Sequence, residues 1–196
     1  MKATTGPRTE INIRFPEFKE RHTKLKLLDV CNGGITNGVF NDPSKRKGAY
    51  RLVNVLDMFG TDQINVAALT YLHLEQKEFE RNQVKFGDIF FTRSSLVPAG
   101  IAWSNVFLSH ENNVTFDGHL MKITPNLTKF SSEYLAQYFR SSQIRKQLVV
   151  RGKTGTMTTI GQSDIASVEL NVPSLSEQRK IADFLTAVDE RIGQLI

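Results

Sequence analysis

Basic side chains concentrate in one stretch of the sequence that contains no acidic residue. No carboxylate occurs between Glu133 and Asp164, and the cations inside this interval are Arg140, Arg145, Lys146, Arg151 and Lys153. A second basic cluster is the run Lys45, Arg46 and Lys47. Flexible cations gathered in this way neutralise negative charge without needing a fixed geometry. The pattern favours an acidic partner such as nucleic acid, although many basic enzymes share it.

Two short motifs have residue types that occur in enzymes. Gly152-Lys153-Thr154 resembles the end of a phosphate-binding loop, but that loop requires a glycine where this chain has Gln147. Asp62 with Glu75 and Lys77 matches the residue types of a metal-dependent nuclease, in which carboxylates hold Mg²⁺ and a lysine steadies the attacking water. Such a site needs the glutamate and lysine on a strand beside the aspartate, whereas their segment is rich in helix formers. The nuclease remains the alternative function.

The histidines show no spacing typical of a metal site. His22, His73, His110 and His119 are scattered along the chain and form no ligand pattern with Cys31. The sequence also lacks the glycine-rich fingerprint of a dinucleotide site and the serine elbow of a hydrolase. We expect no metal, no cofactor and no catalytic residue.

The composition indicates one domain with a short appendage. The chain has 196 residues, of which 40% are hydrophobic, and a formal net charge of +5. This length allows one good hydrophobic core but is short for two ordinary domains. The single cysteine cannot form an internal disulfide, and neither a signal peptide nor a run of roughly 18 apolar residues is present. We expect a cytoplasmic protein that does not enter a membrane.

The middle of the chain reads as sheet, followed by helices. Strand character occurs at 50–55, 89–93, 101–107 and 114–123, the last interrupted by a turn at Asp117-Gly118. Residues 24–30 suggest a helical turn, and the glycine-rich stretch 31–38 predicts a loop. Ser131 can cap a helix that continues to about Val149, with Arg140, Arg145 and Lys146 left available. A short strand is expected at 168–172.

The end of the chain predicts an extended helix. Ser174-Leu175-Ser176-Glu177 has the spacing of a capping box, in which both side chains satisfy free N–H groups at a helix start. Beyond it an apolar stripe has the spacing of a coiled coil, and its members are Ile181, Leu185, Val188, Ile192 and Leu195. The stripe predicts pairing with another helix. The alternative is an ordinary amphipathic helix that lies on its own domain.

Four stretches of the sequence resemble one known family. They are 12–18, the Gly-Asp strand entry at 84–93, the helix at 132–148, and 172–185 with its Pro-x-x-x-Glu-Gln start. Together they resemble the DNA specificity subunits of type I restriction-modification systems, and the last stretch is the most specific. A full subunit of that family has two recognition domains and two spacer helices, so this chain resembles one half.

The resemblance implies sequence-specific recognition of double-stranded DNA without catalysis. Each recognition domain of the family reads one part of a split target, while separate subunits methylate and cleave the DNA. The implied partners are double-stranded DNA, methyltransferase subunits, restriction subunits, and either a second specificity half or a second copy joined through the C-terminal helix. An RNA-binding or purely scaffolding protein is the other class that the sequence leaves open.

Residues that fit DNA contact fall into two groups. Arginine can bind O6 and N7 of guanine, and asparagine can bind N6 and N7 of adenine. The candidates for phosphate contact are Lys45, Arg46, Lys47, Arg145 and Lys153, and those for base contact are Arg93, Ser94, Ser95, Asn112, Asn113, Arg151 and Thr154. A structural alternative exists for each group: a lysine run can be a solvated turn, paired asparagines a tight turn, and an arginine the partner of a carboxylate.

We therefore predict an α+β fold. The recognition domain, residues 1–172, should have a curved mixed β-sheet with flanking helices. Residues 173–196 should form the start of a long spacer or dimerisation helix of coiled-coil type.

Overall fold

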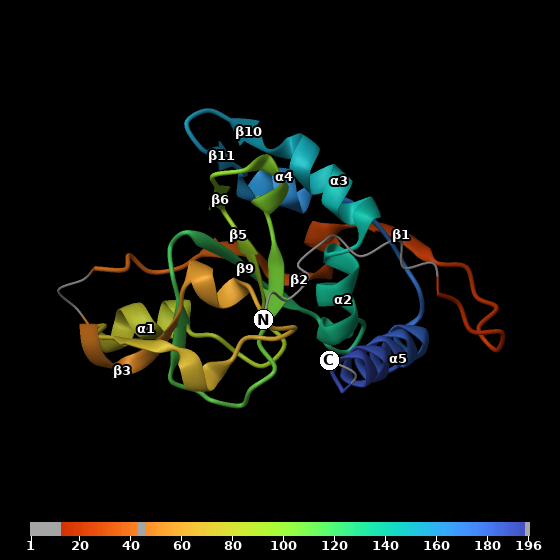
Figure 1. Ribbon diagram of the computed structural model, residues 1–196, viewed down its shortest axis with the longest axis horizontal. Helices are drawn as coiled ribbons and strands as arrows, with labels where there is room; N and C mark the ends of the chain where they lie inside the picture. Colours follow the sequence, from red (N-terminus) through yellow and green to blue (C-terminus); the bar gives the residue numbers. More distant parts are fainter. Residues whose placement is uncertain (1–12, 43–45, 195–196) are drawn as a thin grey trace.

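A central sheet of four antiparallel strands organises the fold (Figure 1). The computed structural model describes residues 13–42 and 46–194. The strands of this sheet, in spatial order, are β2 (Cys31–Asn37), β9 (Leu120–Pro125), β5 (Ile89–Thr92) and β7 (Ser104–Val106). Side chains alternate along β5, so Ile89 and Phe91 enter one hydrophobic cluster and Phe90 enters another. Both faces of the central sheet are therefore covered.

Three smaller sheets surround the central one. One contains β4 (Thr70–Leu72), β3 (Arg46–Val53) and β8 (Val114–Phe116), with β3 antiparallel to β4 and parallel to β8. Another contains β10 (Lys153–Thr154), β11 (Thr158–Thr159) and β6 (Ser94–Ser95). The third pairs β1 (Thr23–Lys26) with β12 (Glu169–Val172). The predicted α+β class is confirmed, with the strands divided among several sheets.

Helices cover one face of the central sheet. The α-helices are α1 (Gln76–Asn82), α2 (Ser132–Phe139), α3 (Ser142–Arg151), α4 (Gln162–Ala166) and α5 (Leu175–Gly193). The largest hydrophobic cluster joins α2, α3, α4 and the start of α5 to β5 and β9. Short 3-10 helices occur at Leu27–Val30, Val55–Met58, Val66–Ala68 and Pro98–Gly100. Within the described ranges, no helix combines the length and apolar character that a bilayer span requires.

The helix predicted from Ser131 to Val149 is two helices. The cap is confirmed, because the Ser131 hydroxyl accepts a hydrogen bond from the N–H of Tyr134 at 3.2 Å. Ser141 adopts an extended backbone that separates α2 from α3. In one straight helix Arg140 and Arg145 would project about 140° apart. The break between the helices lets both guanidinium groups reach carbonyls of the 99–104 segment.

Two predictions for the N-terminal region have different outcomes. The helical turn predicted at 24–30 is present as the 3-10 helix Leu27–Val30, preceded by the end of β1, whereas the loop predicted at 31–38 is wrong, because this stretch contains β2. Gly33 and Gly34 have φ values of 86° and 87°, in the region that favours glycine. They lie where the register with β9 shifts between Cys31 and Ile35. The glycines thus form an irregularity inside a strand, where a side-chain pattern cannot indicate pairing.

Helix α5 begins where the sequence predicts, but its expected capping box is absent. Within the described residues no side chain caps its first turn, and the Ser174 hydroxyl contacts that of Ser176 at 3.1 Å. The side chain of Glu177 is only 1% exposed and turns inward, with Arg14 Nε and His22 Nε2 each 3.8 Å from its carboxylate oxygens. Gln178 anchors the helix: its Oε1 accepts from the Ser131 N–H at 3.0 Å, and its Nε2 donates to the Pro173 carbonyl at 2.9 Å.

The apolar stripe of α5 is divided between the protein's own core and the surface. Ile181 is 2% exposed in the main hydrophobic cluster, and Leu185 packs against that cluster. Val188 and Ile192 are 38% and 50% exposed, and Leu195 lies outside the described residues. The prediction that Ile181 pairs with another helix is wrong, because the intramolecular core already covers it. The first turns of α5 match the amphipathic alternative, while its later turns present apolar side chains to solvent.

Candidate nucleic-acid interface

The three-stranded sheet β6–β11–β10, which we call the tip sheet, gathers four of the predicted residues. Ser94 and Ser95 pair with Thr159 and Thr158, and these pair in turn with Lys153 and Thr154. Lys153 and Thr154 are exposed, and the two serines are half-buried. The backbone pairing thus joins candidates that lie more than fifty residues apart in the sequence. Figure 1 shows the tip sheet at one end of the molecule, away from α5.

Arg93 leads into the tip sheet with a fixed backbone and a free side chain. Its N–H donates to the His119 carbonyl at 2.9 Å, and its carbonyl accepts from the Ile160 N–H at 3.1 Å. The side chain is exposed and forms no hydrogen bond or ion pair with any residue that the structure describes. The alternative role of Arg93, as the partner of a carboxylate, therefore finds no support in this geometry.

A polar hollow of about 830 Å³ lies beside the tip sheet, and we call it the edge hollow. Arg93 and Lys153 line it together with Asn37, His119, Gln162 and Asp164. The hollow forms where β2 and β5 end and β9 begins, since antiparallel neighbours alternate in direction. Its lining contains hydrogen-bond donors and acceptors, and side chains of both charge signs. A surface that contacts the edges of bases needs such a mixture.

Three lining residues of the edge hollow, Asn37, His119 and Gln162, were not predicted from the sequence. Gln162 Nε2 donates to Asn37 Oδ1 at 2.7 Å, and these residues are 125 positions apart. His119 follows the Asp117-Gly118 turn, which the sequence does indicate. Nothing in the sequence brings the three segments together, because strand pairing alone makes them neighbours.

Arg151 is near the tip sheet but is partly occupied. Its Nε donates to the Ser167 hydroxyl at 3.1 Å, and a terminal nitrogen donates to the Gln147 carbonyl at 2.9 Å. The side chain is half-buried at the end of α3. A base contact through Arg151 would use the N–H donors of the guanidinium that are not engaged in these two hydrogen bonds.

The remaining candidates lie around β3, separate from the tip sheet (Figure 1). Asn113 Nδ2 donates to the Ala49 carbonyl at 3.3 Å, and the Asn112 carbonyl accepts from Gln83 Nε2 at 2.8 Å. Arg46 and Lys47 belong to β3, whereas Lys45 lies outside the described residues. The structure therefore divides the predicted site into two groups, and the tip-sheet group is the more complete.

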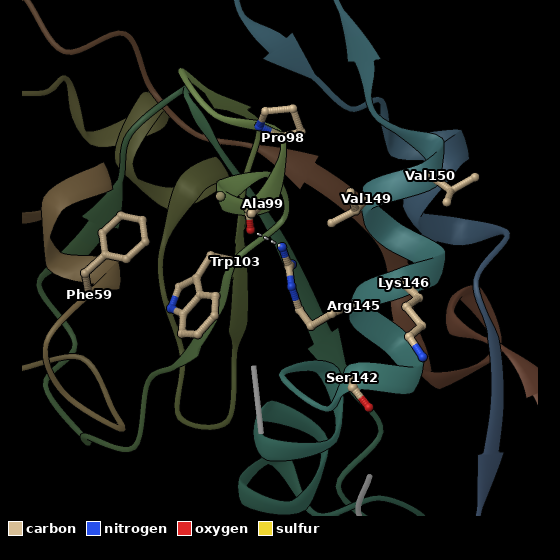
Figure 2. Close-up of a pocket in the computed structure, with 10 residues that line it drawn as sticks. Phe59, Pro98, Ala99, Trp103, Ser142, Arg145, Lys146, Val149 and Val150 are labelled. Carbon is tan, nitrogen blue, oxygen red and sulfur yellow. Dashed lines mark hydrogen bonds between the residues drawn. The ribbon is translucent and has the colours of Figure 1, made fainter. Parts of the chain in front are cut away.

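Arg145 does not fit the predicted phosphate contact. Its side chain is buried, and its guanidinium donates to the carbonyls of Ala99, Ile101 and Ala102 at 2.8, 2.6 and 2.6 Å. It also lies over the Trp103 ring, 5.7 Å from the centroid, beside an apolar groove of about 700 Å³ (Figure 2). Burial lowers the pKa of Arg145 to about 10, so the group still carries its charge at neutral pH. Arg145 holds the 99–103 segment and is removed from the proposed interface.

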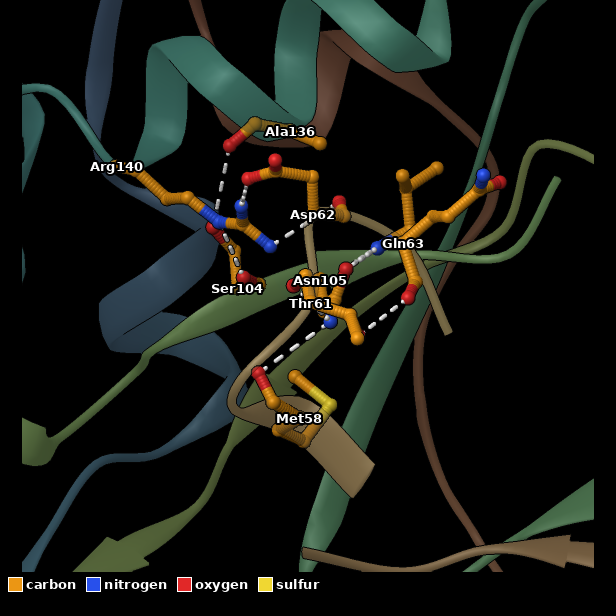
Figure 3. A network of polar contacts seen from close by, with 9 residues as sticks. Met58, Thr61, Asp62, Gln63, Ser104, Asn105, Ala136 and Arg140 are labelled. Atoms are coloured by element: carbon orange, nitrogen blue, oxygen red, sulfur yellow. Dashed lines mark hydrogen bonds and ion pairs between the residues drawn. The ribbon is translucent and has the colours of Figure 1, made fainter. Parts of the chain in front are cut away.

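The geometry required by the nuclease alternative is not present. Asp62 pairs with Arg140 at 3.1 Å, and the same arginine donates to the Ser104 carbonyl at 2.9 Å (Figure 3). Glu75 precedes α1 and Lys77 belongs to it, so neither is on a strand beside Asp62. Across residues 13–42 and 46–194, no group of three His, Cys, Asp or Glu residues could hold a metal ion. Arg140 is also not available at the surface as predicted.

Comparison with known proteins identifies similar chains. A family model described as the type I restriction modification DNA specificity domain matches residues 19–195. A Methanocaldococcus jannaschii protein, named as the MjaX type I restriction enzyme specificity subunit, is 23% identical over 192 residues, which cover 96% of this chain and 43% of that protein. The HindI specificity subunit of Haemophilus influenzae is 25% identical over 115 residues, 57% of this chain and 24% of that protein.

Solved structures show the same fold. The HsdS subunit from Thermoanaerobacter tengcongensis superposes with a TM-score of 0.61 at 18% identity, over 94% of this chain and 40% of that chain. The type I restriction-modification S subunit from M. genitalium gives 0.57 at 14% identity, over 97% and 43%. The present chain spans less than half the length of each of these proteins.

Proposed function

Because the chain belongs to the type I restriction modification DNA specificity family, we propose that it recognises one part of a split target in double-stranded DNA. The observation that carries this proposal is the convergence of Arg93, Ser94, Ser95, Lys153 and Thr154 on one exposed edge. Their side chains offer hydrogen-bond donors and acceptors on and beside the three-stranded tip sheet. This is the arrangement that base reading in the major groove requires.

Within this surface the roles divide by chemistry. Lys153 is exposed and flexible, so it suits a phosphate, whereas Arg93 combines a fixed backbone with a free guanidinium and suits guanine. The candidates around β3 form a second contact with the DNA, in which Arg46 and Lys47 suit phosphates and Asn112 and Asn113 suit bases. Residues 1–172 act as the recognition unit and catalyse nothing, while α5 acts as the spacer.

The exposed end of α5 supports a further part of the proposal. Val188 and Ile192 lie four residues apart and remain open to another helix. Their partner is the spacer helix of a second specificity half or of a second copy of this chain. Through this assembly the recognition domain directs methyltransferase subunits, and restriction subunits bound with them, to the target.

Methylation mapping tests the proposed function. The full chain is co-purified with its cognate methyltransferase subunit, and the modified bases in a DNA library are located by sequencing. We expect methylation confined to one short sequence motif, and Arg93→Ala should relax that motif at one position. Lys129→Ala, which removes an exposed cation far along the chain from the tip sheet, serves as the control. Methylation without any sequence preference would contradict the proposal.

A binding comparison separates double-stranded DNA from the other class of partner. The full chain is titrated with one sequence as a DNA duplex, as single-stranded DNA and as single-stranded RNA at two salt concentrations. We expect the duplex to bind most tightly, with an affinity that falls as salt rises because phosphate contacts release counterions. Preference for RNA, or no salt-dependent binding, would favour the RNA-binding or scaffolding alternatives.

A further inference from the structure

His119 is the lining residue of the edge hollow whose hydrogen-bonding role the structure fixes most closely. Its Nδ1 lies 2.8 Å from Asp117 Oδ1, and the same oxygen accepts the backbone N–H of His119 at 2.7 Å. Asp117 is 7% exposed at its side chain, whereas the imidazole is 66% exposed. A buried carboxylate thus holds one side of a ring whose other side faces solvent.

The carboxylate determines which ring nitrogen carries the hydrogen. A carboxylate only accepts hydrogen bonds, so Nδ1 must be the donor in this pair. In the neutral imidazole, Nε2 is then a bare acceptor. Nδ1 and Nε2 are separated by Cε1 and their bonding directions diverge widely, so this acceptor points away from the Asp117 carboxylate.

The turn that carries His119 is held on both sides. The Asp117 N–H donates to the Val53 carbonyl at 3.0 Å, and the Gly118 N–H donates to the Val39 carbonyl at 2.7 Å. On the other side, the His119 carbonyl accepts from the Arg93 N–H at 2.9 Å. The backbones of His119 and of the proposed guanine-binding arginine, Arg93, therefore have a fixed spacing at adjacent strand ends. Loss of freedom on binding is small for such a preorganised group.

The lining of the hollow carries both charge signs. Arg93 and Lys153 bring positive charge that suits a phosphate or a base acceptor, while Asp164 brings negative charge. In the major groove, the hydrogen-bond donors of the bases are the exocyclic amino groups, N6 of adenine and N4 of cytosine. An acceptor nitrogen in this place has one of these groups as its natural partner.

We propose that His119, oriented by Asp117, reads one base of the DNA target by accepting a hydrogen bond at Nε2 from an exocyclic amino group. This inference rests on the proposed function and adds a specificity residue to it. Asp117 is a positioning residue, because it contacts His119 and not the base. Adenine and cytosine share the amino chemistry, and the test below separates them.

The test removes single amino groups from the DNA. The full chain first selects its preferred duplex from a pool with randomised base pairs. Each adenine of that duplex is then replaced by purine, and each cytosine by pyrimidin-2-one, which lack only the amino group. At one position the wild-type chain should lose affinity by roughly three- to tenfold, the effect of one hydrogen bond. The analogue that produces the loss identifies the base.

The variant His119→Ala completes the comparison. It should bind the unmodified duplex roughly three- to tenfold more weakly than wild type does. Removing the amino group at the identified position should not weaken its binding further, while amino deletions at other positions should have the same effect as in wild type. His110→Ala, at an exposed histidine that stacks on Phe86 and does not line the edge hollow, should behave as wild type. Circular dichroism checks that each variant is folded.

Distinct results overturn the inference and the proposed function. If wild type and His119→Ala respond equally to every amino deletion, His119 does not accept from an amino group, while the selected sequence still supports DNA recognition. If a loss dependent on His119 occurs only with 7-deazaguanine in place of guanine, the imidazole donates and the amino assignment is wrong. If the wild-type chain selects no sequence, the proposed function itself fails.

Discussion

Arg140 and Arg145 are structural residues, although their position in a basic stretch suggests DNA contact. Both are buried, and both guanidinium groups lie over the Trp103 ring, at 5.6 and 5.7 Å from its centroid. Carbonyl groups of the 99–104 segment accept their hydrogen bonds. A buried guanidinium with these partners stabilises a loop that has little regular structure. Arg93 and Lys153, in contrast, are exposed beside the tip sheet and can meet an outside partner.

Replacing Arg145 with Leu should destabilise the protein. The buried carbonyls of Ile101 and Ala102 would lose their donor, as would the more exposed carbonyl of Ala99, at a cost of about 2–4 kcal/mol in the free energy of unfolding. Urea denaturation measures this change. Lys146→Leu, at the exposed neighbour on α3, is the control and should shift stability by less than about 0.5 kcal/mol. Equal effects of the two substitutions would contradict the assigned role of Arg145.

Cys31 should react slowly with thiol reagents in the native protein. Burial, with the nearby charge of Asp29, raises the pKa of Cys31 to about 12. Because the thiolate is the reactive form, the reaction at pH 8 should be more than about 100-fold slower than in urea and should accelerate as the pH rises toward 12. Ellman's reagent measures both rates. A native rate equal to the rate in urea would show that the Cys31 environment is not as described.

At the residue level, the sequence identifies side chains that could contact DNA, but it does not show which of them are buried. Residue type alone singled out Arg93 and Lys153, which are exposed. Type could not distinguish them from Arg145, because burial is decided by the break between α2 and α3. His119 could not be predicted as a site residue for a different reason. A single histidine has no spacing that indicates a site, and the residues around it come from other segments of the chain.

Helix α5 connects two environments, because its first turns belong to the core and its last turns do not. Its start at Leu175 was predicted correctly, but for the wrong reason, since Glu177 turns inward instead of capping. The spacing of apolar residues identified one face of α5, but it could not show which of them pack in the protein's own core and which remain exposed. Local sequence also failed for β2, because its paired glycines indicated a loop and its pairing with β9 is a long-range contact. Strand pairing and helix packing are long-range effects that local patterns do not contain.

Replacing Gln178 with Ala should loosen the attachment of α5. The Ser131 N–H and the Pro173 carbonyl, both bound by Gln178, would lose their partners, at a cost of about 2–3 kcal/mol. Hydrogen exchange should increase at the start of α2 and of α5. Gln194→Ala, at the exposed end of the same helix, provides the control. Unchanged exchange in Gln178→Ala would remove this residue as the anchor.

The two ends of the α5 stripe should respond differently to substitution. Val188→Glu and Ile192→Glu should weaken association between chains without changing the unfolding of the monomer, because both side chains are exposed. Ile181→Ala should instead lower monomer stability by about 2–4 kcal/mol, since it leaves a cavity in the core. Analytical ultracentrifugation and thermal unfolding separate the two effects. Association unchanged by both glutamates would count against the pairing helix.

On the scale of the whole molecule, the tip sheet and α5 lie apart (Figure 1). The central sheet between them has helices on one face and a second hydrophobic cluster on the other, so it can hold the two surfaces at a fixed distance. Such rigidity suits a protein that reads one part of a split target while its helix sets the distance to the next part. The proposed recognition surface and the proposed assembly surface could then vary independently.

Competition between duplexes tests whether the chain recognises a DNA sequence through Arg93. The affinity of the full chain is measured for its selected duplex and for a scrambled duplex of the same composition, with wild type and with Arg93→Ala. We expect wild type to prefer the selected duplex by at least about tenfold, and Arg93→Ala to reduce this ratio of affinities while the salt dependence of binding stays similar. Equal affinity of the wild-type chain for both duplexes would contradict the proposed function.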